Sequence, residues 1–147
     1  MTRNTVVKID WILHATEDFQ KIAEPLNELL GIEKKEIVKQ SLSGHFGNPI
    51  FMLHTELKKK RADQFIEKFV SRISRDMMME MLTNIEELIS KSSMYIRFSK
   101  QNLVKKILIP EEKDPIRIVI YTPTYVKKKI PDTYRKLLSE NGDKTRK

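Results

Sequence analysis

Hydrophobic and polar residues alternate in several short runs along the chain. In the first run, hydrophobic residues from Val7 to Leu13 occupy every second position. This period of two is typical of a strand that is buried on one face. The last two predicted strands are separated by a polar segment bounded by Pro110 and Pro115, which predicts a hairpin. The predicted strands are residues 5–15, 36–42, 50–57, 94–99, 103–109 and 116–121.

Hydrophobic residues at spacings of three and four predict helices between these strands. The first helix follows Thr16, which can serve as its N-cap, and ends at Gly31, which suits a left-handed C-cap. Pro25 lies inside this helix and is expected to kink or split it. The other predicted helices are residues 62–73, 74–89 and 131–138.

The order of the elements predicts an α+β fold, with a mixed, mostly antiparallel sheet and helices packed on one face. The order is β-α-β-β-α-α-β, followed by the hairpin. We expect a single domain in residues 1–130, followed by a short terminal helix and a basic tail in residues 131–147.

The connections between elements predict which loops lie together. A right-handed crossover makes the first two strands run in the same direction, so that both end at one edge of the sheet. If the next two helices pack antiparallel, the strand at 94–99 also ends at that edge. We therefore expect residues 14–18, 44–48 and 97–101 to form one polar rim.

Composition excludes several classes of site. The chain has no cysteine, which excludes disulfides, thiolate zinc sites and cysteine nucleophiles. No apolar run approaches the ~20 residues of a membrane span. The first residues lack the apolar segment of a signal peptide. We expect a cytoplasmic protein.

Positive charge is concentrated in the last third of the chain. The net charge is +8, and residues 1–99 hold 15 basic and 14 acidic residues whereas residues 100–147 hold 13 and 6. Such an excess indicates a polyanionic partner (RNA, DNA or an anionic surface) or serves only for solubility. A further basic run at residues 58–61 is either a solvated corner or a second place to hold phosphate.

The residues of the expected rim suit RNA. Its lysines and arginine can contact phosphates, and glycines let backbone N–H groups approach them. Phe46, Tyr121 and Tyr125 can stack on unpaired bases. The loop at 44–48 is alternatively a plain hairpin turn. The candidate RNA-binding residues are His14, Thr16, Glu17, Asp18, Gly44, His45, Phe46, Gly47, Asn48, Arg97, Lys100, Gln101, Lys105 and Lys106.

Two other functions remain open. A metal-dependent hydrolase could use His14, Asp18, His45 and His54, which are suitable ligand types, although no closely spaced pair fixes two of them together. An assembly module would use the basic half to dock on a larger complex. No nucleophile motif is present. We predict a protein that is not an enzyme and that holds no metal or cofactor.

Three motifs in this order resemble a known family. They are His-Ala-Thr-Glu-Asp at residues 14–18, Gly-His-Phe-Gly-Asn-Pro-Ile at residues 44–50 and Arg-Phe-Ser-Lys-Gln at residues 97–101. Together they resemble the archaeal RNA-binding family described as predicted exosome subunits. The resemblance implies the fold of the large-subunit ribosomal protein that binds 5S ribosomal RNA. It also implies RNA binding without catalysis, with structured or ribosomal RNA and with ribosome or exosome components as partners.

Overall fold

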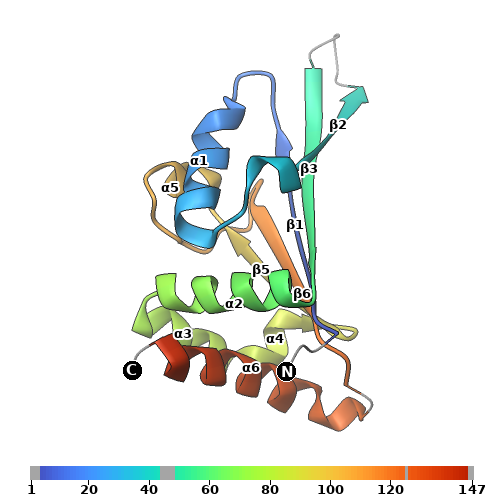
Figure 1. Cartoon of the computed structure of the whole chain (residues 1–147), viewed down its shortest axis with the longest axis vertical. Coiled ribbons are helices and arrows are strands. Elements are labelled where there is room, and N and C mark those ends of the chain that lie inside the picture. The colour runs from blue at the N-terminus through green and yellow to red at the C-terminus, as the bar shows by residue number, and fades with distance from the viewer. Residues whose placement is uncertain (1–3, 44–48, 125, 146–147) are drawn as a thin grey trace.

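A single sheet organises the molecule. The computed structural model describes residues 4–43, 49–124 and 126–145. They form a six-stranded antiparallel sheet in the order β2-β3-β1-β6-β5-β4, with helices on one face, which confirms the predicted α+β fold (Figure 1). The strands are β1 (Val6–Leu13), β2 (Val38–Ser43), β3 (Pro49–Lys58), β4 (Ile89–Ser90), β5 (Ser93–Phe98) and β6 (Ile116–Tyr121).

The helices fall into two groups on the covered face. In Figure 1, α1 and α5 lie beside one half of the sheet, and α2, α3, α4 and α6 gather at the other end. No helix in the described part of the chain is long and apolar enough to cross a membrane. The helices are α1 (Phe19–Leu30), α2 (Lys60–Arg72), α3 (Arg75–Thr83), α4 (Ile85–Leu88), α5 (Lys100–Val104) and α6 (Ile130–Thr145), with short 3-10 turns η1 (Lys34–Glu36) and η3 (Lys127–Lys129).

The core lies between the sheet and these helices. The alternation in β1 turns its hydrophobic residues inward, and Trp11 is 2% exposed. Phe65 and Phe69 of α2 stack with centroids 6.1 Å apart, and Phe69 packs on Phe98 of β5 at 5.9 Å. The contact between Phe69 and Phe98 joins α2 to the end of β5, the strand next to the edge strand β4.

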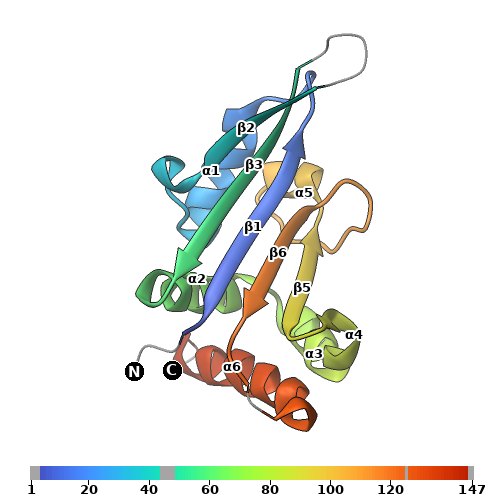
Figure 2. The ribbon, with the colours of Figure 1, turned by 90° about the vertical axis from the view of Figure 1, so that its right-hand side faces the viewer.

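The other face of the sheet carries no helix among the described residues, and we call it the open face (Figure 2). Antiparallel register sets its side chains in rows across the strands. Asp10 of β1 is opposite His54 of β3 and opposite Arg117 of β6. Arg117 is in turn opposite Arg97 of β5. A row of polar side chains therefore crosses the open face.

The expected shared edge is present. Because β3 and β6 run opposite to β1, the strands β1, β2 and β5 point in one direction and end at the same edge. The first two strands of the chain are not neighbours, however, since β3 lies between them. We call the edge where β1, β2 and β5 end the rim.

The prediction of a hairpin between residues 103–109 and 116–121 is wrong, because residues 103–109 form no strand. The Ser99 side chain accepts a hydrogen bond from Asn102 N (3.1 Å) and starts the short helix α5. Between α5 and β6 the chain returns to the end of β5, where Phe98 bridges Pro110, Ser99 N donates to Ile109 O (2.8 Å) and Glu111 N donates to Arg97 O (3.1 Å). Strand β6 pairs with β1 and β5 instead.

Two expectations for α1 also need correction. Asp18, not Thr16, is its N-cap, and the Asp18 side chain accepts from Gln20 N at 2.9 Å. The helix continues through Pro25 rather than splitting there. Gly31 ends it as predicted, with φ +72° in the left-handed region.

Candidate functional site

Lys100 lies at the centre of a polar cluster on the rim. Its side chain is only 5% exposed, although it begins a short surface helix. Its Nζ donates to Ile12 O (2.8 Å) and Glu17 Oε1 (3.1 Å) and forms an ion pair with Asp114 Oδ2 (2.7 Å). An ammonium group has three protons, and these three oxygens satisfy all of them. Burial of this charge is possible because it is paired and hydrogen-bonded.

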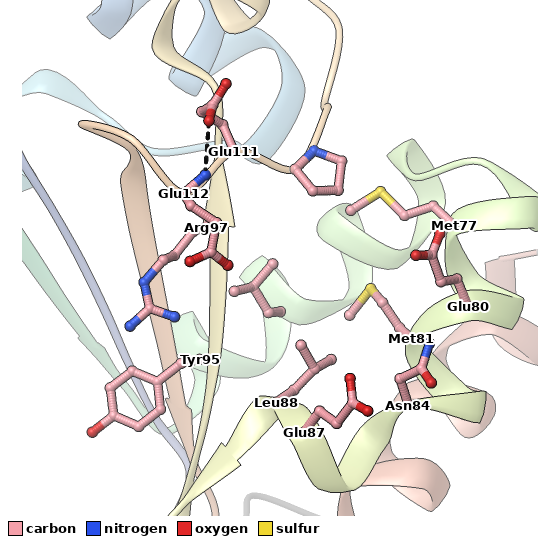
Figure 3. Close-up of a pocket in the computed structure, with 12 residues that line it drawn as sticks. Met77, Glu80, Met81, Asn84, Glu87, Leu88, Tyr95, Arg97, Glu111 and Glu112 are labelled. Atoms are coloured by element: carbon pink, nitrogen blue, oxygen red, sulfur yellow. Dashed lines mark hydrogen bonds between the residues drawn. The ribbon is translucent and has the colours of Figure 1, made fainter.

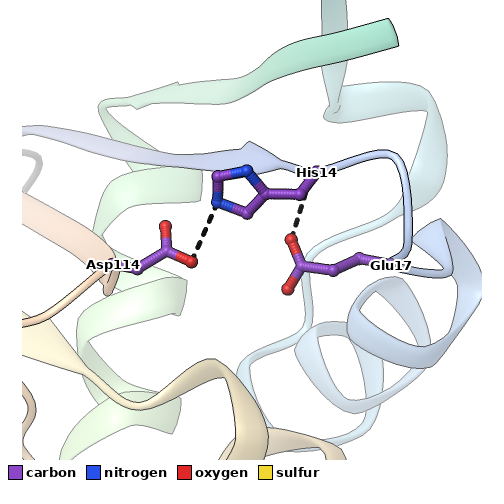
Figure 4. A group of neighbouring side chains, drawn as sticks. All are labelled: His14, Glu17 and Asp114. Atoms are coloured by element: carbon purple, nitrogen blue, oxygen red, sulfur yellow. Dashed lines mark hydrogen bonds and ion pairs between the residues drawn. The ribbon is translucent and has the colours of Figure 1, made fainter. Parts of the chain in front are cut away.

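His14 completes the same cluster (Figure 4). Its Nε2 lies 3.0 Å from Asp114 Oδ2, and its backbone N donates to Glu17 Oε1 at 2.8 Å. Two carboxylates are thus shared between His14 and Lys100. Lys100 is predicted to contact phosphate, and in this structure its three protons are engaged by one carbonyl and two carboxylate oxygens. Lys100 is a positioning residue that joins the end of β1 to the loop before β6.

The cluster also bears on the metal-dependent alternative. The ligand atoms of His14, Glu17 and Asp114 lie within 4.8 Å of one another, which is a suitable set for a divalent ion. The Lys100 ammonium, however, already supplies a positive charge to both carboxylates. Asp18, which the sequence suggested as a ligand, caps α1 instead. The geometry favours a structural role for these groups.

The other described rim residues are more exposed. Thr16, Gln101 and Lys105 are exposed at the surface. Lys106 pairs with Glu28 of α1 at 2.8 Å, and this hydrogen bond raises the pKa of Lys106. Among the described rim residues, Thr16, Gln101 and Lys105 therefore have side chains that remain available to a ligand.

The remaining predicted contacts are placed as follows. Residues 44–48, with Gly44, His45 and Gly47, lie outside the described residues, as does Tyr125. Strands β2 and β3 pair as far as Ser43 and Pro49. Tyr121 ends β6 at the opposite edge, so the structure does not bring it to the rim.

The described residues with the clearest affinity for an anion lie on the open face. The guanidinium carbons of Arg97 and Arg117 lie 5.8 and 5.9 Å from the Tyr95 ring centroid. Arg117 binds Asp10 through Nε (3.2 Å) and Nη2 (2.9 Å). Among the described residues, no carboxylate pairs with Arg97. Both guanidinium groups therefore lie near the Tyr95 ring, and within the described structure only that of Arg117 is paired with a carboxylate, that of Asp10. We call Tyr95, Arg97 and Arg117 the arginine cluster.

A groove of about 360 Å³ runs along β5 beside the arginine cluster (Figure 3). Its apolar lining includes Met77, Met81 and Leu88 from the helices. Four glutamates also line it, and none of them forms an ion pair within the described structure. Tyr95 and Arg97 of the arginine cluster line the same groove, so the cation of Arg97 and these carboxylates share one surface. The glutamates are Glu80, Glu87, Glu111 and Glu112.

Sequence reasoning did not select Tyr95, Arg117 and Asp114 as site residues. The signal for the first two was present, because both occupy polar-face positions of alternating strands. Their meeting with Arg97 depended on the pairing of β5 with β6, which the predicted hairpin had excluded. Asp114 gave no signal beyond its place in a polar loop.

Known proteins are similar to this chain along most of its length. Residues 6–122 match a family model described as RNA binding. The RNA-binding protein PAB1135 of Pyrococcus abyssi is 29% identical over 130 residues, which cover 84% of each chain. The uncharacterized protein MJ0213 of Methanocaldococcus jannaschii is 26% identical and is covered to 92% of its length.

Solved structures agree with the fold. The DUF54 protein AF2318 of Archaeoglobus fulgidus has a TM-score of 0.76 and 26% identity, covering 93% of this chain and 99% of its own. The DUF54 protein SSO0741 of Sulfolobus solfataricus has a TM-score of 0.73 and 27% identity, covering 92% and 98%. The matched residues span every strand and all helices except α6. This chain therefore belongs to the RNA-binding family.

Proposed function

We propose that this protein binds RNA on its open face and does not cleave it. The observation that carries this proposal is the arginine cluster, where Arg97 has no carboxylate partner among the described residues and lies beside Tyr95. Guanidinium groups bind phosphate oxygens with two parallel hydrogen bonds, and aromatic rings stack on unpaired bases. The relative named as an RNA-binding protein supports the same function.

The rim supplies a second group of contacts in this proposal. Gln101 and Lys105 are exposed there, and the glycine-containing sequence 44–48 follows Ser43, the last residue of β2. Backbone N–H groups near glycines can approach phosphate closely. Lys100 and its two carboxylates hold this edge in place.

The contacts of Lys100 and His14 support the proposal that the protein does not cleave RNA at the rim. A hydrolase needs a carboxylate or imidazole that is free to bind a metal or move a proton. Glu17 and Asp114 are instead engaged by Lys100 and His14. We further propose that the RNA is structured or ribosomal, and that the protein acts in the cytoplasm beside ribosome or exosome components.

A direct test uses purified protein and a labelled RNA hairpin with a single-stranded tail. We expect salt-dependent binding, and intact RNA after incubation with Mg²⁺, Mn²⁺ or Zn²⁺. Metal-dependent cleavage that is lost in His14→Ala would promote the hydrolase. Crosslinking in cells followed by RNA recovery should yield a discrete RNA species. Recovery of protein alone would favour the assembly module.

The groove beside β5 is the observation that favours an assembly role as the second candidate. Its methionine lining is adaptable, and its four glutamates would attract a basic segment of a partner protein. The double variant Glu80→Gln, Glu87→Gln should then release a partner while it leaves RNA affinity unchanged. Retention of every protein partner by this variant would remove the assembly role of the groove.

A further inference from the structure

Lysines from three separate parts of the sequence gather at the end of the sheet opposite the rim. They are lysines 58–60 where β3 ends and α2 begins, Lys91 in the turn between β4 and β5, and the three lysines of η3. Both ribbon views place these segments at the same end of the sheet (Figures 1 and 2). We call this group the lysine edge.

The antiparallel topology brings these segments together. Lys58, Val6, Tyr121 and Ser93 are paired in one row across four strands, so β3 and β6 end where β1 and β5 begin. Lys59 N donates to Thr5 O at 3.3 Å. These contacts place the start of α2 against the first residues of β1.

Helix α6 fixes the other side of the lysine edge. The buried Tyr134 hydroxyl donates to Ser92 O (2.6 Å) and accepts from Thr122 N (3.2 Å). Lys91 and Lys127 line one shallow hollow beside this contact. The three lysine segments therefore sit on a rigid frame.

The charge of the lysine edge is largely uncompensated. Its seven lysines are exposed, and in the described structure only Lys58 forms an ion pair, with Glu56 at 3.6 Å. Lys59 and Lys91 have φ values of 51° and 59°. Glycine and asparagine adopt this left-handed conformation more cheaply than lysine.

We propose that the lysine edge binds the phosphate backbone of RNA that lies along the open face. This inference rests on the proposed function. It gives the RNA a second binding site besides the arginine cluster, so that the RNA would run along the strands from one site to the other. The row of Tyr121 and Lys58 lies four residues along the strands from the row of Arg97 and Arg117. At 3.2–3.4 Å per residue this is about 13 Å, a distance that one RNA segment of a few nucleotides covers. Exposed Tyr121 belongs to the first of these rows, and exposed Lys8 of β1 lies in the row midway between the two.

The test measures how RNA affinity changes with salt. Each phosphate contact contributes about 0.7–0.9 to the slope of log K against log salt. The triple variant Lys58→Gln, Lys91→Gln, Lys127→Gln should therefore reduce the slope by about 2 to 3. The probe is the RNA hairpin with a single-stranded tail. The control Lys21→Gln, Lys34→Gln, Lys68→Gln removes the same charge from exposed lysines elsewhere.

The outcomes separate this inference from the proposed function. A slope reduced in the edge variant but not in the control supports the lysine edge. Equal reductions in both variants, or an unchanged slope in the edge variant, would overturn it while RNA binding itself stands. A wild-type protein that binds no RNA would overturn the proposed function and this inference together.

Discussion

Arg97 and Arg117 are directly opposite each other on β5 and β6, with both guanidinium groups near Tyr95 and with Asp10 paired to Arg117 alone. Like charges opposite each other in a sheet destabilise it by roughly 0.2–1 kcal/mol. A bound phosphate would offset this repulsion. Stability and RNA affinity should therefore respond in opposite directions to loss of one charge.

The first prediction concerns Arg97→Gln. We expect a thermal midpoint equal to or above that of the wild type, because a like charge is removed. RNA affinity should fall about tenfold, or about 1.4 kcal/mol. Calorimetry and fluorescence anisotropy measure the two effects. The control is Arg75→Gln, which removes an exposed charge on α3. Equal loss of affinity in both variants would contradict a specific contact.

The second prediction concerns Lys100→Met. Removal of the buried ammonium leaves Ile12 O unsatisfied and Glu17 and Asp114 without their cation. We expect a loss of about 3 kcal/mol in the free energy of unfolding, as for a broken buried pair. Urea titration measures it. Lys105→Met, at an exposed position, should change stability by less than about 0.5 kcal/mol. A similar small change in Lys100→Met would show that the cluster is not structural.

The third prediction concerns acid stability and Glu36. Arg61 donates to both Glu36 carboxylate oxygens, at 2.9 and 2.5 Å, and this hydrogen bonding lowers the pKa of Glu36 below 4.5. A lowered pKa in the folded state stabilises it above the unfolded pKa. That contribution disappears as the pH falls from about 4.5 through the folded pKa.

Glu36→Gln should therefore cost about 1 kcal/mol at pH 7, a value reduced because Arg61 is partly exposed. The difference from the wild type should shrink below pH 4.5. Urea titrations across this range check the result. A difference that stays constant with pH would exclude the ion pair as its cause.

The fourth prediction concerns Tyr134→Phe. The Tyr134 side chain is fully buried, and burial raises the pKa of its hydroxyl. Without the hydroxyl, Thr122 N and Ser92 O lose a buried partner. We expect a loss of about 2 kcal/mol in the free energy of unfolding. Tyr121→Phe, at a residue that is 39% exposed, is the matched control and should change little.

The fifth prediction concerns the segment between β2 and β3. Gly47→Ala should weaken RNA binding more than His45→Ala, because a Cβ obstructs the approach of backbone N–H groups to phosphate. Both variants should keep the fold. Thermal midpoint and RNA affinity are measured on the same samples. A stability loss in Gly47→Ala with unchanged RNA affinity in both would show that this segment is only a turn.

The pattern of hydrophobic residues predicted helices and strands well where it repeated over many consecutive residues. The alternation from Val7 to Leu13 gave β1, and Gly31 ended α1 where expected, because each depends on neighbouring residues alone. The hairpin at 103–109 failed because Ser99 capping started a helix in a segment whose hydrophobic residues also suit a strand. Residues Val104, Ile107 and Ile109 remain exposed there.

The sequence by itself determined the fold class, the rim and the excess of positive charge. The tertiary structure decided which groups each charged side chain contacts. It buried Lys100 beside carboxylates from distant segments, Glu17 and Asp114, with which the ammonium group forms ion pairs. It also set Arg97 against Arg117, 20 positions later in the chain, by strand pairing. Charge is a property of each residue, whereas the partner of a charge depends on which strands and loops the topology brings together.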